Sequence, residues 1–309
     1  MITIAVPDQQ MHSRLAPQLP EVNLIVWRAA DGAPPQHVDL AVLGYLGSSK
    51  NLATFEGWDV AALQSQSLGY DGVADHLPAG ISYCNAVAVH EASTAELAVG
   101  LIIAEQRGFP EHFRNQQTGT WDQHQFIGVA GTTVLIIGAG GVGNQIADKL
   151  APFEANVVRV ARTGRNDARG GIQSMDALRA LLAQADVVAL AVPLTQATAG
   201  LVDAEFLATM KPGALLVNVS RGKVVDTDAL VAAASAGHVR AALDVTDPEP
   251  LPADHALWST PGITITPHIG GYTSAMHGRV DAVVRDQARR LLAGEPLAHV
   301  VIAAQSSRG

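Results

Sequence analysis

The sequence predicts an α/β protein built on parallel, doubly wound sheets. Short apolar segments rich in β-branched residues recur along the chain, and helical segments alternate with them after residue 90. A glycine-rich turn joins one of these strands directly to a helix. Strands that alternate with helices pair in parallel, because each helical crossover returns the chain to the same end of the sheet.

Composition limits the classes of function. The chain of 309 residues is long enough for two domains with buried cores. Its apolar runs reach only about ten residues, against the roughly twenty needed to span a bilayer, so we expect no membrane segment. The first residues lack a secretory signal, and we expect a cytoplasmic protein. A formal net charge of −9 without basic blocks argues against a nucleic-acid partner.

Metal binding is not expected. A single cysteine, Cys84, excludes zinc or iron–sulfur sites built on cysteines, and none of the histidines has the H-x-x-x-H spacing that places two imidazoles on one helix face.

The first part of the chain resembles an α/β domain of its own. Apolar segments alternate with polar connections there, at residues 2–6, 22–27, 40–45, 62–67 and 81–85. This spacing is typical of a parallel sheet. A helix over Glu91–Gln106, with an acidic first turn, is expected to lead into a second domain.

Residues 131–165 form a strand, a glycine-rich turn, a helix and a second strand in unbroken succession. The strand is Thr133–Ile137, the helix runs from about Gly141 to Ala151, and the second strand covers 156–162. The turn fits G-x-G-x-x-G, which brings a pyrophosphate against the backbone and the N-terminus of the helix. The residues expected to bind a dinucleotide here are Gly138, Gly140, Gly141, Val142 and Gly143.

The alternation continues towards the C-terminus. Helices are expected at 175–182, 204–210 and 226–236, and strands at 186–192, 214–220, 240–245 and 263–266. A long amphipathic helix over 273–292 can return to the first domain, which would make that domain discontinuous. The expected domains are residues 1–90 with 275–309, and residues 91–274.

Three reactive side chains follow strands of the second domain. Arg221, Glu249 and His268 each lie just after a predicted strand, where doubly wound sheets place their active residues. An imidazole backed by a carboxylate can act as a general acid or base, and a guanidinium can bind a carboxylate with its fork of donors. With a nicotinamide alongside, these groups suffice for hydride transfer to a 2-oxo acid. Taken singly, each could instead be an ordinary surface or core residue.

Three segments of the sequence resemble those of a known enzyme family. The segments "VPLTQATAGLVDAEFLATMKPGALLVNVSRGKVVDTDAL", "ALDVTDPEPLP" and "TPHIGG" resemble the D-isomer-specific 2-hydroxyacid dehydrogenases, in order and at matching spacing, over roughly residues 90–295. The resemblance is weaker earlier, although "SLGYD" and "GISYCNA" look like landmarks of the family. It implies two Rossmann-like or flavodoxin-like domains with a cleft between them, the first completed by the C-terminal helix, and a homodimer.

The resemblance also implies roles for individual residues. Arg221 would bind the carboxylate and 2-oxo group of the substrate, His268 would donate a proton to the carbonyl oxygen, and Glu249 would keep that histidine protonated. The cofactor would also contact Pro193, Thr198 and Asp244. Of these, Asp244 would bind the nicotinamide carboxamide. Backbone N–H groups around Leu46, Gly47, Leu68 and Gly69 would complete the substrate carboxylate site in the first domain.

The sequence predicts a preference for NADP(H), with NAD(H) possible. In the dinucleotide motif an acidic residue about 20 positions on binds the ribose 2′-hydroxyl of NAD. Ala161 stands where the NAD-dependent members of the resembling family carry aspartate, and it is followed by Arg162, Thr163 and Arg165. Two guanidinium groups and a hydroxyl suit a 2′-phosphate. The alternative is that these are solvated loop residues.

The substrate is expected to be a small, unphosphorylated 2-oxo acid such as glyoxylate or hydroxypyruvate. The first 90 residues carry three basic and eight acidic side chains, a poor setting for a phosphorylated acid. Lys50 could nevertheless bind a phosphate, so a D-3-phosphoglycerate dehydrogenase without a regulatory domain is the alternative. A dinucleotide-binding corepressor, a protein of another class, is less favoured.

Overall fold

The computed structural model describes residues 1–45 and 49–304. The chain divides into two compact units, residues 1–90 with 273–309 and residues 91–272. Each unit is built on its own sheet, of six strands in the first and eight in the second within the described residues. The sheets are mostly parallel, so the predicted α/β class is confirmed.

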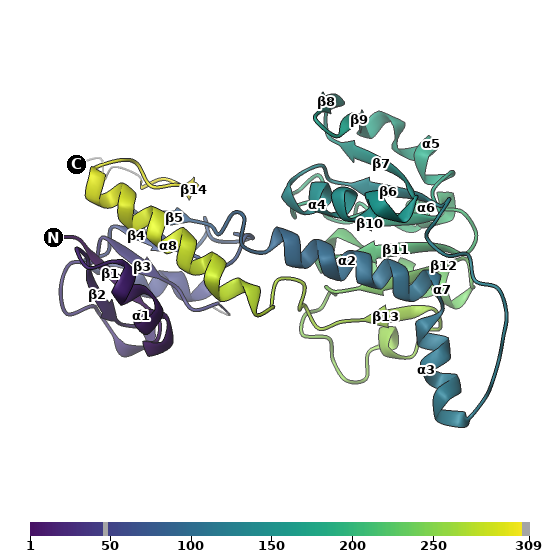
Figure 1. The fold of residues 1–309 in the computed structure, drawn as a ribbon, viewed down its shortest axis with the longest axis horizontal. Coiled ribbons are helices and arrows are strands. Elements are labelled where there is room, and N and C mark those ends of the chain that lie inside the picture. The colour runs from purple at the N-terminus through teal and green to yellow at the C-terminus, as the bar shows by residue number, and fades with distance from the viewer. Residues whose placement is uncertain (46–48, 305–309) are drawn as a thin grey trace. The chain divides into compact units, whose positions relative to one another are not determined.

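The first unit carries the sheet with the strand order β14-β5-β4-β3-β1-β2. Among its described residues, only β14 runs antiparallel, beside β5. The strands are β1 (Thr3–Val6), β2 (Asn23–Val26), β3 (Leu40–Val42), β4 (Ala62–Gln64), β5 (Ser82–Cys84) and β14 (Val300–Ile302). Two helices, α1 (Gln9–Leu15) and α8 (Ala275–Ala293), complete the unit (Figure 1).

Helices α1 and α8 pack together on one face of this sheet. Arg14 of α1 donates to both carboxylate oxygens of the buried Asp281 of α8, at 2.7 and 3.1 Å. Side chains of both helices share a buried cluster with β1 and β3. The sequence did not indicate α1, a short helix whose first turn is capped by the Asp8 carboxylate on the Met11 N–H.

The second unit carries the strand order β13-β12-β11-β10-β6-β7-β9-β8. Its strands are β6 (Thr133–Ile137), β7 (Asn156–Ala161), β8 (Arg165–Asp167), β9 (Gly170–Ser174), β10 (Val187–Leu190), β11 (Ala214–Asn218), β12 (Val239–Leu243) and β13 (Ile263–Ile265). Its α-helices are α2 (Glu91–Gln106), α3 (Phe109–Thr118), α4 (Gly141–Leu150), α5 (Leu178–Leu182), α6 (Ala204–Thr209) and α7 (Thr227–Ser235) (Figure 1).

Helices cover both faces of this sheet, as a doubly wound fold requires. One buried cluster joins α2 and α4 to one face, and another joins α5, α6 and α7 to the opposite face. Short 3-10 turns occur at 16–18, 29–31, 49–55, 151–153, 175–177, 222–224 and 256–258. Of the helices described, none is both long and apolar enough to cross a membrane.

One part of this unit differs from the sequence-based expectation. No strand is predicted between residues 162 and 175, but the chain forms the antiparallel hairpin β8–β9 after β7. β9 then pairs in parallel with β7, which places the hairpin at one edge of the sheet (Figure 1). These strands are short and mostly exposed, so they lack the apolar pattern from which strands are read in a sequence.

Candidate active site

The glycine-rich turn between β6 and α4 has the close packing that its motif predicts. Gly138 has φ +111°, and a Cβ added there would lie 2.2 Å from the Ala191 carbonyl oxygen at the end of β10. A Cβ on Gly143 would lie 1.8 Å from the Gly138 carbonyl oxygen. Both positions therefore exclude any side chain, because helix and strand approach too closely.

The same turn leaves room for a phosphate. A Cβ added at Gly140 would have no atom of the described residues within 4 Å. Gly140 is also the N-cap of α4, and no side chain in the described part of the chain caps its first turn. The first N–H groups of a helix lack intrahelical partners, and the helix dipole makes this end positive. Gly141 and Val142 open α4, and the site fits a pyrophosphate.

The residues predicted to bind a 2′-phosphate follow β7 directly. Arg162, Thr163 and Arg165 are all exposed, beyond the end of the strand at Ala161. The Arg165 guanidinium donates to the carbonyl oxygens of Ala139, at 3.3 Å, and of Thr163, at 3.4 Å. Arg165 therefore lies against the glycine-rich turn. Arg162 makes no hydrogen bond or ion pair with any residue that the structure describes, which leaves its charge available to a ligand.

The three predicted reactive residues follow neighbouring strands. Arg221 comes after β11, Glu249 after β12 and His268 after β13, and these strands pair in parallel register. Carboxyl ends of parallel strands meet at one edge of a sheet. The loops after β11 and β12 pack closely at Gly222, because a Cβ added there would lie 1.9 Å from the Thr246 carbonyl oxygen.

His268 and Glu249 form an ion pair between His268 Nδ1 and a carboxylate oxygen. The hydrogen bond that His268 donates to the Glu249 carboxylate raises the pKa of His268 above its ordinary value, although desolvation and the positive charge of Arg221 act in the opposite direction. The same hydrogen bond lowers the pKa of Glu249. The imidazole is 48% exposed, so a reactant can reach a protonated ring that is held from behind.

Asp244 organises the loop that carries His268. Its buried carboxylate accepts hydrogen bonds from the Thr266 hydroxyl and from the N–H groups of Ile269 and Gly270, at 2.6 to 2.9 Å. His268 itself adopts φ +52°, which is uncommon for a residue with a side chain. The sequence predicts for Asp244 only a contact with the cofactor, and no pattern along the chain indicates this supporting arrangement.

Arg221 lies within electrostatic reach of the pair, because its charge lowers the pKa values of both Glu249 and His268. Its Nη1 donates to the Ser220 carbonyl oxygen at 2.8 Å. The fully buried Asn218 side chain holds this loop by donating to the Arg221 carbonyl oxygen at 3.0 Å and accepting from the Ser220 N–H and hydroxyl. A cation, an imidazole and a carboxylate are thus brought together.

The remaining predicted residues divide between the units. In the second unit, the Thr198 hydroxyl donates to the Pro193 carbonyl oxygen at 2.6 Å and closes the loop after β10. In the first unit, the Asn85 side chain donates to the Leu68 carbonyl oxygen at 2.8 Å and holds the bend that precedes Gly69. The two other predicted substrate contacts, Leu46 and Gly47, lie outside the described residues.

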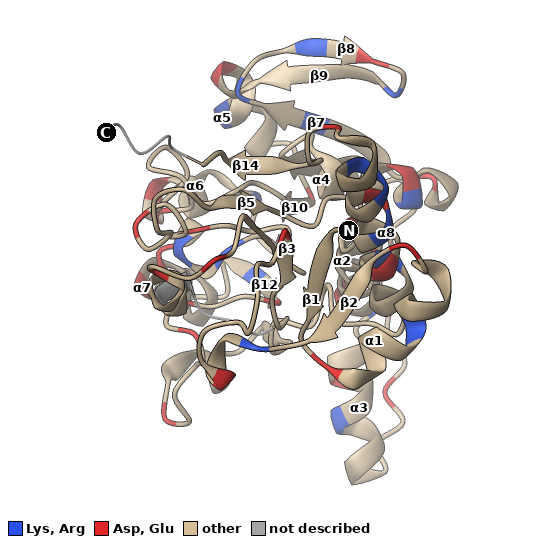
Figure 2. Ribbon diagram, turned by 90° about the vertical axis from the view of Figure 1, so that its left-hand side faces the viewer, with Lys and Arg blue, Asp and Glu red and all other residues tan. Residues whose placement is uncertain are grey.

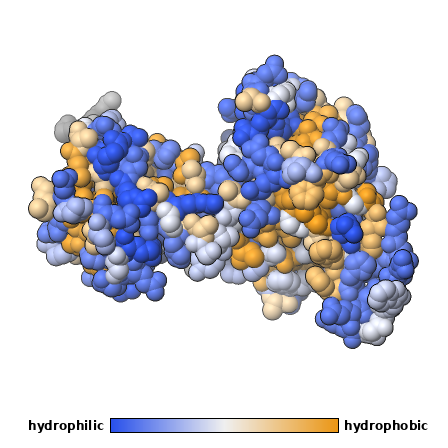
Figure 3. Space-filling model, viewed as in Figure 1, coloured by the Kyte–Doolittle hydropathy of each residue, from blue (hydrophilic) through white to orange (hydrophobic). Residues whose placement is uncertain are grey.

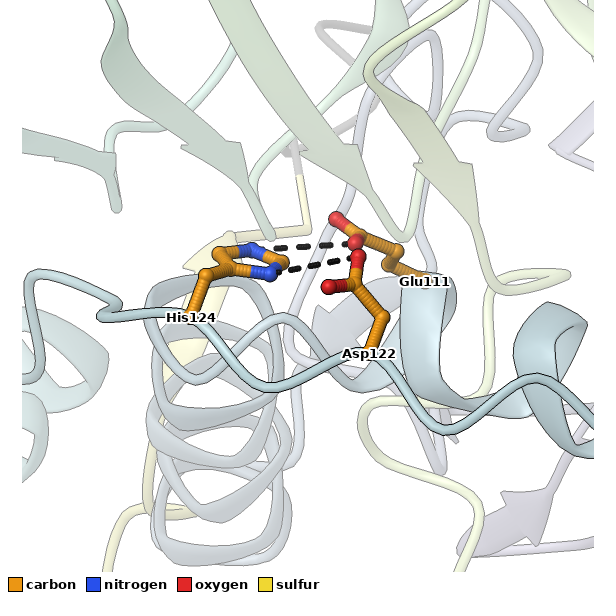
Figure 4. A group of neighbouring side chains, drawn as sticks. All are labelled: Glu111, Asp122 and His124. Carbon is orange, nitrogen blue, oxygen red and sulfur yellow. Dashed lines mark ion pairs between the residues drawn. The ribbon is translucent and has the colours of Figure 1, made fainter.

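A further polar cluster lies away from these strand ends. Glu111 of α3 and Asp122 flank His124, at 3.6 Å and 3.4 Å from its two ring nitrogens, and the three side chains point toward one another (Figure 4). The ligand atoms lie within 4.8 Å of one another, a grouping that the sequence did not suggest. Two carboxylates facing one imidazole are satisfied as an ion pair, and we assign no metal here.

Comparison with known sequences supplies a family. The profile of the D-isomer specific 2-hydroxyacid dehydrogenase, NAD binding domain, matches residues 99–270. The human glyoxylate reductase/hydroxypyruvate reductase is 32% identical over 291 residues, which cover 88% of each chain. A D-3-phosphoglycerate dehydrogenase of Mycobacterium tuberculosis is 38% identical over 70% of this chain, but the match spans only 42% of that protein's length.

A solved structure shares the fold throughout. The D-isomer specific 2-hydroxyacid dehydrogenase of Xanthobacter autotrophicus, in complex with NADPH and MES, is 27% identical to this chain. It covers 97% of both chains with a TM-score of 0.83.

Proposed function

The chain belongs to the D-isomer specific 2-hydroxyacid dehydrogenase family and is an NAD(P)-binding member of it, and we propose that it reduces a small 2-oxo acid to the D-2-hydroxy acid with NADPH. The observation that carries this proposal is the His268–Glu249 ion pair beside Arg221, at the carboxyl edge of a sheet that also bears a phosphate-binding turn. A proton donor and a carboxylate-binding cation are the groups that such a reduction needs.

In this mechanism the glycine-rich turn between β6 and α4 would hold the dinucleotide, and its nicotinamide would supply the hydride that C2 of the 2-oxo acid needs. Protonated His268 gives its proton to the carbonyl oxygen, so that the C=O bond becomes C–OH. Glu249 keeps the imidazole protonated before the transfer and fixes its Nδ1, which leaves Nε2 to face the substrate. Arg221 binds the substrate carboxylate and polarises the carbonyl group.

The preference for NADPH rests on the residues after β7. Ala161 offers no carboxylate to a ribose 2′-hydroxyl. Arg162 is exposed and has no charged partner among the described residues, and Arg165 lies beside the glycine-rich turn. Two guanidinium groups at this position favour a 2′-phosphate. The NADPH complex of the Xanthobacter relative supports the same preference.

A small, unphosphorylated acid is the favoured substrate. The basic side chains described among the first 90 residues are both engaged, Arg14 with Asp281 and Arg28 with Asp31. A guanidinium already paired with a carboxylate is poorly placed to bind a substrate phosphate. The human relative named for glyoxylate and hydroxypyruvate, matched over 88% of its length, agrees with this choice.

The alternative substrate is a phosphorylated 2-oxo acid. The 38% identity to the mycobacterial D-3-phosphoglycerate dehydrogenase favours it, although the match spans 42% of that protein. The side chain of Lys50 lies outside the described residues.

Initial rates separate these possibilities. Glyoxylate, hydroxypyruvate, phosphohydroxypyruvate and a longer 2-oxo acid are each assayed with NADPH and with NADH. We expect the highest kcat/KM for glyoxylate or hydroxypyruvate with NADPH. A highest value for phosphohydroxypyruvate would favour the alternative, and negligible turnover of every acid would overturn the proposed activity.

We also propose that the protein is a homodimer. Helix α3 and the segment after it project from the sheet of the second unit (Figure 1). They expose large apolar side chains, with Trp121 92% exposed, together with Phe109, Phe113 and Ile127. Apolar side chains gathered on one projection suit burial against a second copy.

A further inference from the structure

The β8–β9 hairpin carries Arg165, yet it is poorly anchored by apolar packing. Ile172 is the buried apolar side chain of the two strands, while their other described residues are exposed or half-buried. The surface over the hairpin is correspondingly hydrophilic (Figure 3). An edge hairpin with so little apolar burial needs polar contacts to hold one position.

Two arginines supply polar contacts between the hairpin and α4. Arg169, in the turn of the hairpin, donates to both oxygens of Asp148 of α4 at 2.6 and 2.7 Å, but this pair is exposed. Arg159 of β7 supplies the buried contact. Its side chain is 3% exposed, and its two terminal nitrogens donate to both oxygens of Asp167, at 2.6 and 2.7 Å. The same guanidinium donates to the Gly170 carbonyl oxygen at 3.2 Å and to Asn144 Oδ1 of α4 at 3.0 Å. Arg159 therefore joins the turn of the hairpin to the helix that begins at the glycine-rich turn.

The start of β8 also contacts the glycine-rich turn. Arg165, the first residue of β8, donates to the Ala139 carbonyl oxygen within the turn. Asp167, the last residue of β8, accepts hydrogen bonds from Arg159 on both of its carboxylate oxygens. β8 therefore has one contact at its first residue and another at its last, and Figure 2 shows residues of both charge signs along this strand.

We propose that Asp167 is a positioning residue for the discrimination of NADPH from NADH. Through its paired hydrogen bonds to Arg159 it fixes β8 against α4, and β8 in turn places Arg165 beside the glycine-rich turn, where a 2′-phosphate would bind. The inference rests on the proposed NADPH preference and extends it to a residue that does not itself touch the cofactor.

Removal of the Asp167 carboxylate should change NADPH binding in opposite directions, depending on whether Asp167 positions Arg165 or acts only through its negative charge. Asp167 carries a negative charge on the strand that bears Arg165. If charge alone mattered, removing it would strengthen binding of the 2′-phosphate. If Asp167 positions Arg165, removing the carboxylate releases β8 and weakens NADPH instead. Arg159 also holds the pKa of Asp167 at about 2, so the carboxylate is ionised throughout the usual range of assay pH.

The test measures dissociation constants by the fluorescence of bound NADPH and NADH. For Asp167→Asn we expect the Kd for NADPH to rise about tenfold and the Kd for NADH to change less than about twofold. In the background of Arg165→Ala the substitution should add almost nothing, because residues that act through one another are not additive. Glu205→Gln is the control, since its ion pair with Arg179 joins α6 to α5 outside the hairpin, is exposed on both sides and contributes little.

Tighter NADPH binding in Asp167→Asn, equal losses for both cofactors, or a full effect in the Arg165→Ala background would each overturn the positioning role. If Asp167→Asn does not fold, Arg159→Lys is measured instead. It keeps the positive charge but loses the paired donors to Asp167, and we expect the same selective rise in the Kd for NADPH. Failure of the NADPH preference itself is separate: it would appear as Arg162→Ala and Arg165→Ala variants that bind both cofactors as the wild type does.

Discussion

Arg162 and Arg165 are both basic and exposed, but they differ in their contacts. Arg165 is bound to backbone oxygens of the glycine-rich turn, whereas Arg162 is free of hydrogen bonds among the described residues. A free guanidinium can give its full charge-assisted hydrogen bonding to a ligand, about 1.5 to 3 kcal/mol. Their separate contributions to a 2′-phosphate site can therefore be measured.

We expect Arg162→Ala to weaken NADPH by about ten- to a hundredfold and to leave NADH nearly unchanged, because only NADPH carries the 2′-phosphate. Isothermal titration with each cofactor measures the difference. Arg179→Ala, which removes an exposed arginine paired with Glu205 elsewhere in the unit, is the control. Equal losses for NADPH and NADH would contradict the assignment.

His268 and Glu249 set the pH dependence of the proposed reduction. The protonated imidazole is the reactive form, so activity is present below the raised pKa of His268 and is lost as the pH rises through it. In Glu249→Gln the carboxylate that raises this pKa is gone, and the basic limb of the kcat/KM profile should move to lower pH. Glu205→Gln is the control. An unshifted basic limb in Glu249→Gln would refute the role of that carboxylate.

At the scale of elements, the turn between β6 and α4 depends on the absence of side chains. We expect Gly143→Ala to weaken NADPH and NADH alike, by at least about tenfold, because the added Cβ displaces the Gly138 carbonyl and with it the start of α4. Gly100→Ala in α2 is the matched control, since its Cβ would meet no described atom within 4 Å. A selective loss of NADPH in Gly143→Ala would contradict a role in binding the shared pyrophosphate.

The loops after β11, β12 and β13 show how elements assemble the reactive groups. Asn218 and Asp244 are buried side chains at the ends of β11 and β12, and each satisfies backbone N–H or C=O groups of the loop that follows or lies beside it. Such fully bonded buried groups hold loops in one conformation. The positions of Arg221 and His268 are therefore set by neighbours that take no part in proton transfer.

At the scale of the whole molecule, the exposed apolar side chains on and after α3 predict self-association. Light scattering coupled to size exclusion should give about twice the 32.2 kDa of one chain. Trp121→Asp should shift the mass towards that of a monomer, because it places a charge at the most exposed of these aromatic rings. Trp258→Asp, at an exposed ring in another loop, is the control. A monomeric wild type would refute the dimer.

The sequence by itself determined the fold class, the turn at Gly138–Gly143 and the alternation of strands with helices in the second unit. These features are encoded locally: an apolar run marks a buried strand, and a glycine spacing marks a turn too tight for side chains. Arg221, Glu249 and His268 could be singled out because each follows a recognisable strand. The order of neighbouring strands then brought them to one edge.

Only the tertiary structure decided how these residues are supported. The β8–β9 hairpin carries no apolar alternation, and Arg159 links it to α4 by donating to both Asp167 and Asn144. Asp244 likewise bonds residues more than twenty positions away. Contacts of this kind join side chains from separate elements, so a pattern along one segment does not contain them. They arise only when the sheet has assembled and buried groups must find partners.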